Sequence, residues 1–391
     1  MDLPRLEDLP DLEDQRVLLR VDFNVPLRDG VVDDDLRITT ALPTVTWLCE
    51  RGARVVTCGH LGRPKGKPKP GLSMAPVAAR LSELLGTDVA LAPGIEGPKV
   101  ESFLASMCAG DVVMLENLRF DPGEESNDPA FATNLSACCD AYVNEAFGAS
   151  HRAHASIVGP PVVLPSAGGR LLFCEVEVLS QLLDNPKRPF VGILGGVKVS
   201  DKLGVIEALL QQCDLILIGG AMAFTFVAAR GGTVGDSPVE SEMLDECRRL
   251  LATGRVQIPT DVAIARDAIA GAGTRHVAAD EIPAGWKGLD VGPETAGAYA
   301  DVVASAATVV WNGPMGMFEV EPFDAGTRTV ADAMANTRAF TVIGGGDSAS
   351  AVRHFGLADR IDHVSTGGGA TLEFIEQGDL PGLAALRQQR S

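Results

Sequence analysis

Residues 190–211 read FVGILGGVKVSDKLGVIEALLQ, which places a strand pattern, a glycine pair and a helix pattern in direct succession. Phe190–Leu194 is a continuous apolar run of strand length, and Leu203–Gln211 carries apolar residues at helical spacing. The glycine pair between them lets the backbone approach a ligand closely. A strand, a turn and a helix in this order form the repeating unit of parallel α/β sheets, so this segment predicts the fold class.

The same alternation of strand and helix patterns extends over the whole chain. Helix patterns at Ala75–Leu85, Glu240–Leu251 and Ala325–Ala335 lie between apolar runs of strand length. Strands that are apolar on both faces belong to sheets covered by helices on both sides. We therefore expect an α/β protein with two doubly wound parallel-sheet domains joined by a hinge helix. The further expected strands are Val17–Val21, Val55–Cys58, Val112–Leu115, Tyr142–Val143, Leu215–Ile218, Val262–Ala265, Val309–Trp311, Phe340–Ile343 and Ile361–Val364.

An amphipathic helix pattern near the middle of the chain marks the expected domain junction. A length of 391 residues favours two domains. The pattern at Arg170–Leu183 begins after two glycines and ends before Asn185-Pro186. We expect an N-terminal domain at 1–169, an interdomain helix at 170–184 and a C-terminal domain at 185–376.

The composition argues against several classes of protein. The formal net charge of −19, from 33 basic and 52 acidic residues, argues against nucleic-acid binding. No apolar run reaches the ~18 residues of a membrane span, and the acidic, proline-broken start does not resemble a signal peptide. The eight cysteines form no CxxC pair, so we expect reduced thiols, no zinc site and a cytoplasmic location.

Lysines are scarce in this acidic chain. Only eight are present, against 52 aspartates and glutamates. A salt-rich cytoplasm favours such a composition, and we hypothesise that the protein comes from one. Equal activity and folding in dilute buffer and in molar KCl would contradict that hypothesis.

Two of those lysines, Lys198 and Lys202, follow the glycine pair of the opening segment. At this spacing they would face the same way if a helix began there. A helix N-terminus with two cations is a phosphate site, and it would overcome the negative field that repels anionic ligands. The alternative is a plain strand–helix turn with solvated lysines.

Three other loops of the second half carry glycine or acidic groups. Gly344–Ser348 precedes a helix pattern that starts at Ala349, and Asp347 can hold Mg²⁺ on a nucleotide or merely cap the helix. The loop Ser365–Gly369 again offers glycine N–H groups before a helix. The loop NGPMGMFE ends in Glu319, which can accept hydrogen bonds from a ribose. Several such loops in one domain predict a nucleotide site.

The strand ends of the first half are followed by arginine and histidine instead. Arginine is the preferred partner of phosphate and carboxylate groups, so together these residues predict a shared anion pocket, although any single arginine can be merely solvated. The histidines lack acidic or cysteine partners at metal-ligand spacing, so we expect anion contact or a structural role from them. The residues are Arg37, His60, Arg63, Arg119, His151, Arg152 and His154.

Together, these motifs closely resemble those of the phosphoglycerate kinase family, in the order in which that family has them. They are Arg20–Pro26 (RVDFNVP), Gly59–Pro64 (GHLGRP), Leu115–Phe120 (LENLRF), Ala146–His154 (AFGASHRAH), Gly195–Lys202 (GGVKVSDK), Gly219–Phe226 (GGAMAFTF), Val310–Phe318 (VWNGPMGMF), Gly344–Ser348 (GGGDS) and Ser365–Ala370 (STGGGA).

The resemblance implies an enzyme that transfers a phosphoryl group between MgADP or MgATP and 3-phosphoglycerate or 1,3-bisphosphoglycerate in glycolysis. The nucleophile would be the substrate carboxylate, which is ionised at neutral pH and needs no general base. The resemblance also implies a monomer whose domains close about a hinge, with the C-terminal tail 377–391 packed on the N-terminal domain. The segment Pro381–Gln389 fits that returning helix.

Carried over by position, the resemblance implies three groups of site residues. The 3-phosphoglycerate site would comprise Asp22, Phe23, Asn24, Arg37, His60, Leu61, Gly62, Arg63, Arg119 and Arg152. The nucleotide site would comprise Lys202, Glu319, Gly345, Gly346, Asp347 and Ser348, with Asp347 as the ligand of Mg²⁺. Catalytic roles would fall to Arg37, Lys198, Gly345 and Gly368, and Lys198 would contact the transferred phosphoryl group.

Two positions depart from the family pattern without removing a functional group. Ser348 stands where threonine is usual and keeps the hydroxyl. Val197 stands where alanine is common and leaves both lysines in place.

The residues weigh against two other enzyme classes and leave one non-enzymatic alternative. A nicotinamide dehydrogenase would need GxGxxG after the first strand, but Val17–Val21 is followed by DFNVP. A P-loop or protein-kinase-type phosphotransferase would need GxxxxGK[ST] or an HRD/DFG pair, and the chain has neither. A protein that only senses anions would keep the basic pocket, but its glycine loops would not have to bind a nucleotide.

Overall fold

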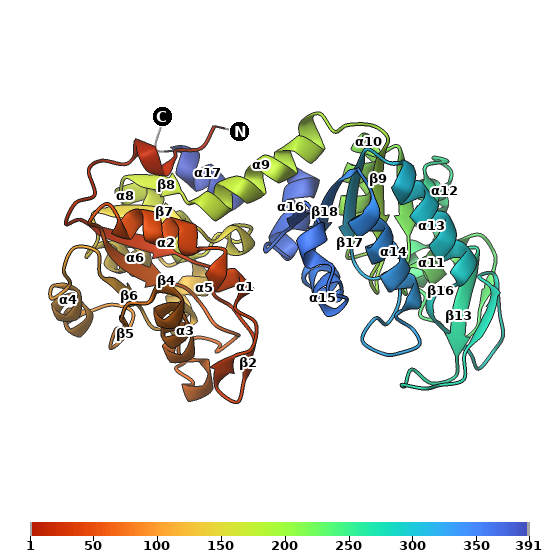
Figure 1. Ribbon diagram of the computed structural model, residues 1–391, viewed down its shortest axis with the longest axis horizontal. Helices are drawn as coiled ribbons and strands as arrows, with labels where there is room; N and C mark the ends of the chain where they lie inside the picture. Colours follow the sequence, from red (N-terminus) through yellow and green to blue (C-terminus); the bar gives the residue numbers. More distant parts are fainter. Residues whose placement is uncertain (1, 389–391) are drawn as a thin grey trace. The chain divides into compact units, whose positions relative to one another are not determined.

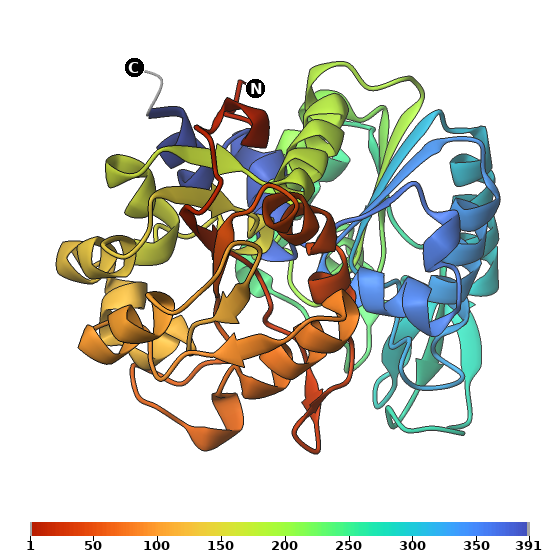
Figure 2. The same ribbon diagram turned by 60° about the vertical axis from the view of Figure 1, so that its left-hand side comes forward.

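Two units make up the protein in its computed structural model, which describes residues 2–388 (Figure 1). The first unit contains the residues up to Glu177 and those from Asp379 onward, and the second contains Val178–Gly378. Each unit is built on a parallel sheet of six strands, with helices on both sides of it (Figures 1 and 2). The expected α/β class with doubly wound parallel sheets is therefore confirmed.

The sheet of the first unit has the strand order β5-β6-β4-β1-β7-β8, with every neighbouring pair parallel. From β1 the chain first builds toward β4 and later returns to add β7 on the other side, so the order reverses between β1 and β7. Ligands of open parallel sheets bind beyond the carboxyl ends of the strands at such a reversal. The strands are β1 Arg16–Arg20, β4 Arg54–Cys58, β5 Val89–Leu91, β6 Val112–Met114, β7 Ala141–Asn144 and β8 Ser166–Gly168.

The sheet of the second unit has the order β12-β10-β9-β17-β18-β19, again with all pairs parallel. Counted along the chain, this is the strand order of dinucleotide-binding sheets, and the reversal lies between β9 and β17. The glycine pair Gly195-Gly196, which directly follows β9, therefore lies at the reversal point. The strands are β9 Phe190–Leu194, β10 Leu215–Ile218, β12 Val256–Gln257, β17 Thr308–Asn312, β18 Phe340–Gly344 and β19 His363–Val364.

One expected parallel strand lies elsewhere. The run Val262–Ala265 belongs to β13 (Asp261–Ala265), which pairs antiparallel with β14 (Arg275–Ala278) and β16 (Lys287–Val291). The connection from β13 to β14 spans only residues 266–274, which is too short for the crossover that a parallel pair needs. Two smaller pairs complete the strands, β2 (Leu27–Arg28) with β3 (Val31–Val32) and β11 (Thr233–Val234) with β15 (Glu281–Ile282).

The helices agree with most of the sequence patterns. The pattern expected over Glu240–Leu251 starts later, because α12 begins at Leu244 after a 3-10 turn and Glu240 itself is extended. The helices of the first unit are α1 Leu36–Thr39, α2 Leu42–Cys49, α3 Ala75–Leu85, α4 Pro98–Leu104, α5 Pro122–Ser126, α6 Pro129–Ser136, α7 Ala155–Val158, α8 Pro160–Val163 and α17 Pro381–Gln388. Those of the second are α10 Leu203–Gln212, α11 Ala223–Ala229, α12 Leu244–Leu251, α13 Pro293–Ser305, α14 Ala325–Asn336, α15 Gly346–His354 and α16 Gly369–Gln377.

Helix α9 (Arg170–Asp184) runs from the first unit into the second. Its first turn is anchored by the buried carboxyl group of Glu145, whose oxygens accept the N–H groups of Leu171 at 3.2 Å and Leu172 at 3.4 Å. Side-chain oxygens in this position satisfy N–H groups at a helix N-terminus that have no partner within the helix.

The chain returns to the first unit at its C-terminal end. Helix α17 packs against α7, α8 and β8, and the N–H of Gly382 donates to the carbonyl of Ser150 at 2.9 Å (Figure 1). Residues 377 and 378, which we expected to belong to the C-terminal tail, are part of the second unit. Gln389, the expected end of this helix, lies outside the described residues.

Each sheet lies in an apolar core of its own, with Val17, Leu19 and Val55 in the first and Ile193, Leu217 and Trp311 in the second. Among residues 2–388, no helix combines the length and the apolarity needed to cross a membrane.

Candidate functional site

The residues predicted to bind an anion in the first unit lie beyond the carboxyl ends of its strands. Arg37, on α1, forms an ion pair with Asp22, which follows β1. Asn24, two residues further on, accepts the N–H of Gly62 at 2.8 Å. The carbonyl of Gly62 accepts Nη1 of Arg119 at 3.0 Å. Segments that follow β1, β4 and β6 are thus joined around residues assigned to 3-phosphoglycerate.

Arg119 is almost buried and its position is strongly constrained. Its Nε lies 3.3 Å from Oε1 of Glu125, and its backbone N–H donates to Asn117 Oδ1 at 3.1 Å. Burial lowers the pKa of Arg119; Glu125 opposes that shift and Arg152 adds to it. A guanidinium held in this way is preorganised for an anion, because little side-chain freedom is left to lose on binding.

The three histidines near the pocket are held in the neutral form. Burial first, and then the charges of Arg20 and Arg119, lower the pKa of His60. Burial and the same arginines lower the pKa of His154 to about 4, and burial with Arg152 lowers that of His151. Neutral histidines offer hydrogen bonds, so the positive charge of the pocket comes from its arginines.

The other predicted residues of this site fall into two groups. Arg63 and Arg152 are exposed and can reach a ligand directly, and Nε of Arg152 donates to Nε2 of His151 at 3.1 Å. Phe23 and Leu61 place their side chains in the core, so only their main-chain groups can contact a ligand.

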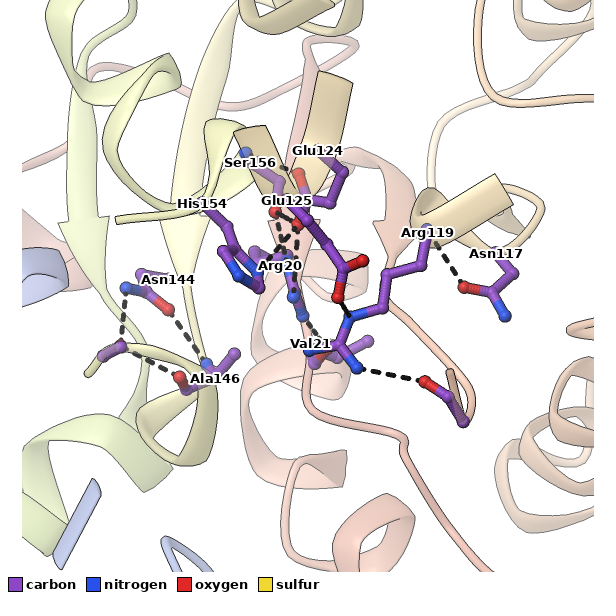
Figure 3. A network of polar contacts seen from close by, with 12 residues as sticks. Arg20, Val21, Asn117, Arg119, Glu124, Glu125, Asn144, Ala146, His154 and Ser156 are labelled. Carbon is purple, nitrogen blue, oxygen red and sulfur yellow. Dashed lines mark hydrogen bonds and ion pairs between the residues drawn. The ribbon is translucent and has the colours of Figure 1, made fainter. Parts of the chain in front are cut away.

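A buried network behind the pocket was not predicted from the sequence (Figure 3). Arg20 is fully buried on β1, its Nε donates to Ser156 Oγ at 2.8 Å, and its Nη2 lies 3.7 Å from Glu124 Oε1. Ser156 in turn donates its hydroxyl to Glu124 at 2.6 Å and its N–H at 2.9 Å. The motif RVDFNVP begins with Arg20, but nothing local in the sequence indicates that a buried Glu124 balances its charge.

In the second unit, the loops after β9 and β17 are in direct contact. The ammonium of Lys202 donates to Oδ1 of Asn312, the last residue of β17, at 2.5 Å. Gly195 allows this approach, because a Cβ there would lie 2.0 Å from the carbonyl oxygen of Pro314. Burial lowers the pKa of Lys202, while the nearby charges of Asp347 and Asp201 oppose the shift.

The loop after β18 completes the same corner. Ser348 Oγ accepts the N–H of Gly313 at 2.5 Å. Gly345 has φ +89°, and a Cβ there would lie 2.6 Å from Asn312 Nδ2. That Nδ2 is buried and has no hydrogen-bond partner among the described residues. Asn312, at the end of β17, therefore lies against the loops after β9 and β18, a role that was not predicted from the sequence.

The starts of two helices decide how the loop residues are presented. Helix α10 begins at Leu203, as the helix pattern predicted, so Lys198 and Lys202 precede it and do not share a helix face. Helix α15 begins at Gly346 with Gly345 as its N-cap, so Asp347 lies in the first turn and is not the cap. Asp347, Lys198 and Glu319 are exposed, and Gly368 is the N-cap of α16.

An apolar cavity of about 370 Å³ lies beside these loops, lined among others by Gly196, Gly220, Pro314 and Met315. A flat aromatic group fits a cavity with such a lining. The cavity was missed from the sequence because its walls come from six separate segments of the chain. Its remaining lining includes Phe224, Val262, Leu289, Val291 and Met317.

The sequence of the chain was compared with a family model and with known proteins, and both comparisons found the same enzyme family. A sequence model described as phosphoglycerate kinase matches residues 6–378. The phosphoglycerate kinase of Rubrobacter xylanophilus is 53% identical over 391 residues, covering 100% of this chain and 99% of the relative. That of Frankia casuarinae is 54% identical over 386 residues, covering 95% of this chain and 96% of the relative.

Solved structures agree with the sequence relatives. The structure of phosphoglycerate kinase from Coxiella burnetii superimposes with a TM-score of 0.88 at 37% identity, covering 100% of both chains. The crystal structure of the enzyme from Pyrococcus horikoshii OT3 gives a TM-score of 0.89 at 33% identity, covering 99% of both chains.

Proposed function

The chain belongs to the phosphoglycerate kinase family, and from that premise we propose which of its residues bind each substrate and which act on the transferred group. It is a phosphotransferase with a carboxyl group as acceptor, and it catalyses reversible phosphoryl transfer between 1,3-bisphosphoglycerate with ADP and 3-phosphoglycerate with ATP. The membership excludes the dehydrogenase alternative, even though the second sheet has the strand order of dinucleotide-binding folds.

The nucleotide site of this proposal lies at the carboxyl ends of β9, β17 and β18. Lys202 contacts the nucleotide phosphates, and the N–H groups at the start of α15, from Gly345 to Ser348, receive them. The base occupies the apolar cavity beside Gly196, and Glu319 accepts a hydrogen bond from the ribose. The observation that carries this assignment is the contact between Lys202 and Asn312, which fixes a cation at the point where the strand order reverses.

Asp347 is the residue that would hold Mg²⁺. Its carboxylate is exposed in the first turn of α15 and near enough to Lys202 to influence its pKa. Residues 2–388 contain no group of three or more His, Cys, Asp or Glu that could hold a metal ion. Mg²⁺ that arrives on a nucleotide needs no such group, because one carboxylate, the phosphates and water suffice. When bound, the ion neutralises charge on the phosphates.

In this proposal, the first structural unit binds 3-phosphoglycerate. Arg63, Arg119 and Arg152 hold the phosphate, and the pairs Asp22–Arg37 and Asn24–Gly62 orient the rest of the molecule. Asp22 and Asn24 can accept hydrogen bonds from a substrate hydroxyl. The support is the arginine pocket itself, in a chain whose net charge of −19 would otherwise repel the substrate.

Phosphoryl transfer to a carboxylate requires that the two substrates be positioned and that positive charge face the transferred group. It requires no general base. The attacking carboxylate is already ionised, which fits the neutral histidines of the pocket. In-line transfer spreads negative charge over the equatorial oxygens of the phosphoryl group. In this proposal Lys198, Arg37 and the main-chain N–H groups of Gly345 and Gly368 meet that charge.

The wider setting of the enzyme follows from the same premise. We propose that it works in the cytoplasm as a monomer, without nucleic-acid or membrane partners, and that residues 1–169 and 185–376 act as the two substrate-binding domains on either side of the helix at 170–184.

Separate titrations test the assignment of residues to substrates. Calorimetry would measure the Kd of 3-phosphoglycerate and of MgADP for wild type, Arg119→Ala and Lys202→Met. We expect Arg119→Ala to lose affinity for 3-phosphoglycerate alone, and Lys202→Met for MgADP alone. A reversed pattern, or an equal loss of both ligands in both variants, would overturn it.

A further inference from the structure

The loop that carries Lys198 is held by a carboxylate from a distant part of the chain. Glu240 Oε2 accepts the N–H of Val199 at 2.5 Å and the N–H of Ser200 at 3.3 Å. Its Oε1 accepts the hydroxyl of Ser200 at 2.5 Å. Three hydrogen bonds thus fix the two residues that directly follow Lys198.

Glu240 is itself fixed from behind. Its N–H donates to Oγ1 of Thr225 at 3.2 Å, and Thr225 is buried on α11. On the other side of the loop, the side chain of Val199 is fully buried. The backbone after Lys198 is therefore attached both to the apolar core and, through Glu240, to α11.

The bonds are those of an ionised acceptor. Burial opposes ionisation, but the hydrogen bonds from Ser200 and Val199, together with the charge of Lys198, lower the pKa of Glu240. Hydrogen bonds to an ionised group are stronger than neutral ones. Two consecutive N–H groups next to Lys198, which would suit an external anion, are instead occupied by this carboxylate.

The side chain of Lys198 is exposed, so its direction depends on where the loop holds its Cα. A displacement of ~1 Å of a positioned group can cost about 100-fold in rate.

We propose that Glu240 is a positioning residue for the reaction, which acts by holding the Val199–Ser200 segment so that Lys198 points at the transferred phosphoryl group. This inference rests on the role of Lys198 in the proposed function. The proposed role of Glu240 differs from that of the residues that bind the nucleotide, because Glu240 acts through the loop and contacts no ligand.

A double-mutant cycle tests the dependence on Lys198. The kcat would be measured for Glu240→Ala in the wild-type and Lys198→Ala backgrounds, with Glu242→Ala as the matched control, since Glu242 is exposed two residues further on. We expect Glu240→Ala to lower kcat about tenfold or more in the wild-type background. In the Lys198→Ala background its effect should fall below about twofold, because residues that act through one another are not additive.

Two further measurements separate positioning from binding and from folding. The Kd of MgADP should stay within about twofold of wild type in Glu240→Ala. The substitution displaces Lys198, whose contact is made in the transition state, and leaves the groups that bind the nucleotide in the ground state in place. Glu240→Gln should restore most of kcat, because its amide can accept the N–H groups and donate to Ser200. If Glu240→Ala does not fold, Ser200→Ala removes one of the three bonds and should lower kcat only in the wild-type background.

The experiments distinguish failure of the role proposed for Glu240 from failure of the role proposed for Lys198. Equal losses of kcat in both backgrounds, or a wild-type kcat in Glu240→Ala, would overturn the role of Glu240 while leaving that of Lys198 intact. A wild-type kcat in Lys198→Ala alone would overturn the role of Lys198 and, with it, this inference.

Discussion

The ammonium nitrogen of Lys202 lies 2.5 Å from Oδ1 of Asn312, and this contact joins the loop after β9 to the end of β17. The two residues are separated by 110 positions in the chain. Because β9 and β17 flank the point where the strand order reverses, the contact locates a fixed cation where the fold class binds its ligands.

Asn312→Ala should weaken nucleotide binding by removing the acceptor that holds Lys202. A hydrogen bond to a charged group contributes about 1.5–3 kcal/mol, so the KM for MgATP should rise roughly tenfold or more. The KM for MgATP is obtained from initial rates at saturating 3-phosphoglycerate. Asn134→Ala, at an exposed position of the first unit, is the control. An unchanged KM for MgATP would show that Asn312 does not position Lys202.

Gly345→Ala should disrupt the same corner by steric contact. Gly345 and Gly356 both have positive φ, but a Cβ at Gly345 would lie 2.6 Å from Asn312 Nδ2, whereas one at Gly356 meets nothing within 4 Å. Both variants carry about 1 kcal/mol of backbone strain, and only Gly345→Ala should also raise the Kd of MgADP, by about tenfold. Equal MgADP affinities in the two variants, measured by calorimetry, would refute this role of Gly345.

Arg63→Ala should weaken the binding of 3-phosphoglycerate and leave the nucleotide site intact. Arg63 is exposed beside a pocket whose other arginines are held in place. Loss of one charged hydrogen bond predicts a rise of about tenfold in the KM for 3-phosphoglycerate. Arg28→Ala, which removes an arginine paired with Asp33, is the control. A KM for 3-phosphoglycerate equal to that of wild type would count against the assigned site.

The stability of the protein should fall on acidification through His154. Burial and neighbouring arginines lower its pKa from the model-peptide 6.5 to about 4. The unfolded chain therefore takes up this proton first, so the contribution of neutral His154 is present above pH 6.5 and is lost as the pH falls to about 4.

His154→Gln removes that proton uptake. Between these two pH values, wild type should lose at least about 1 kcal/mol more unfolding free energy than the variant. Urea unfolding at a series of pH values measures the difference, and parallel stability curves would contradict the assigned environment of His154.

The sequence predicted most of the fold because its strands are marked locally. Phe190–Leu194 and Leu215–Ile218 are continuous apolar runs that end at turn residues, and both coincide with β9 and β10. Val262–Ala265 has the same local pattern, yet it pairs antiparallel outside the main sheet. Local pattern reports that a strand exists, whereas its partner depends on the length of the connections.

The site was predictable to the extent that its residues lie in glycine- or arginine-bearing loops. Asn312, Glu240 and the Arg20–Glu124 pair were missed because each acts through a contact far along the chain. No periodicity or spacing marks such contacts. They support the residues that the motifs reveal, and they become visible only when the fold brings the segments together.

The proposed function assigns to Lys198 a contact with the transferred phosphoryl group in the transition state. The most direct measurement is the kcat of Lys198→Ala in an assay that couples ATP and 3-phosphoglycerate to NADH oxidation, with Lys99→Ala on the exposed start of α4 as control. We expect a kcat lowered by about 100-fold or more with KM values changed far less, since the contact is made only in the transition state. A kcat equal to that of wild type would contradict it.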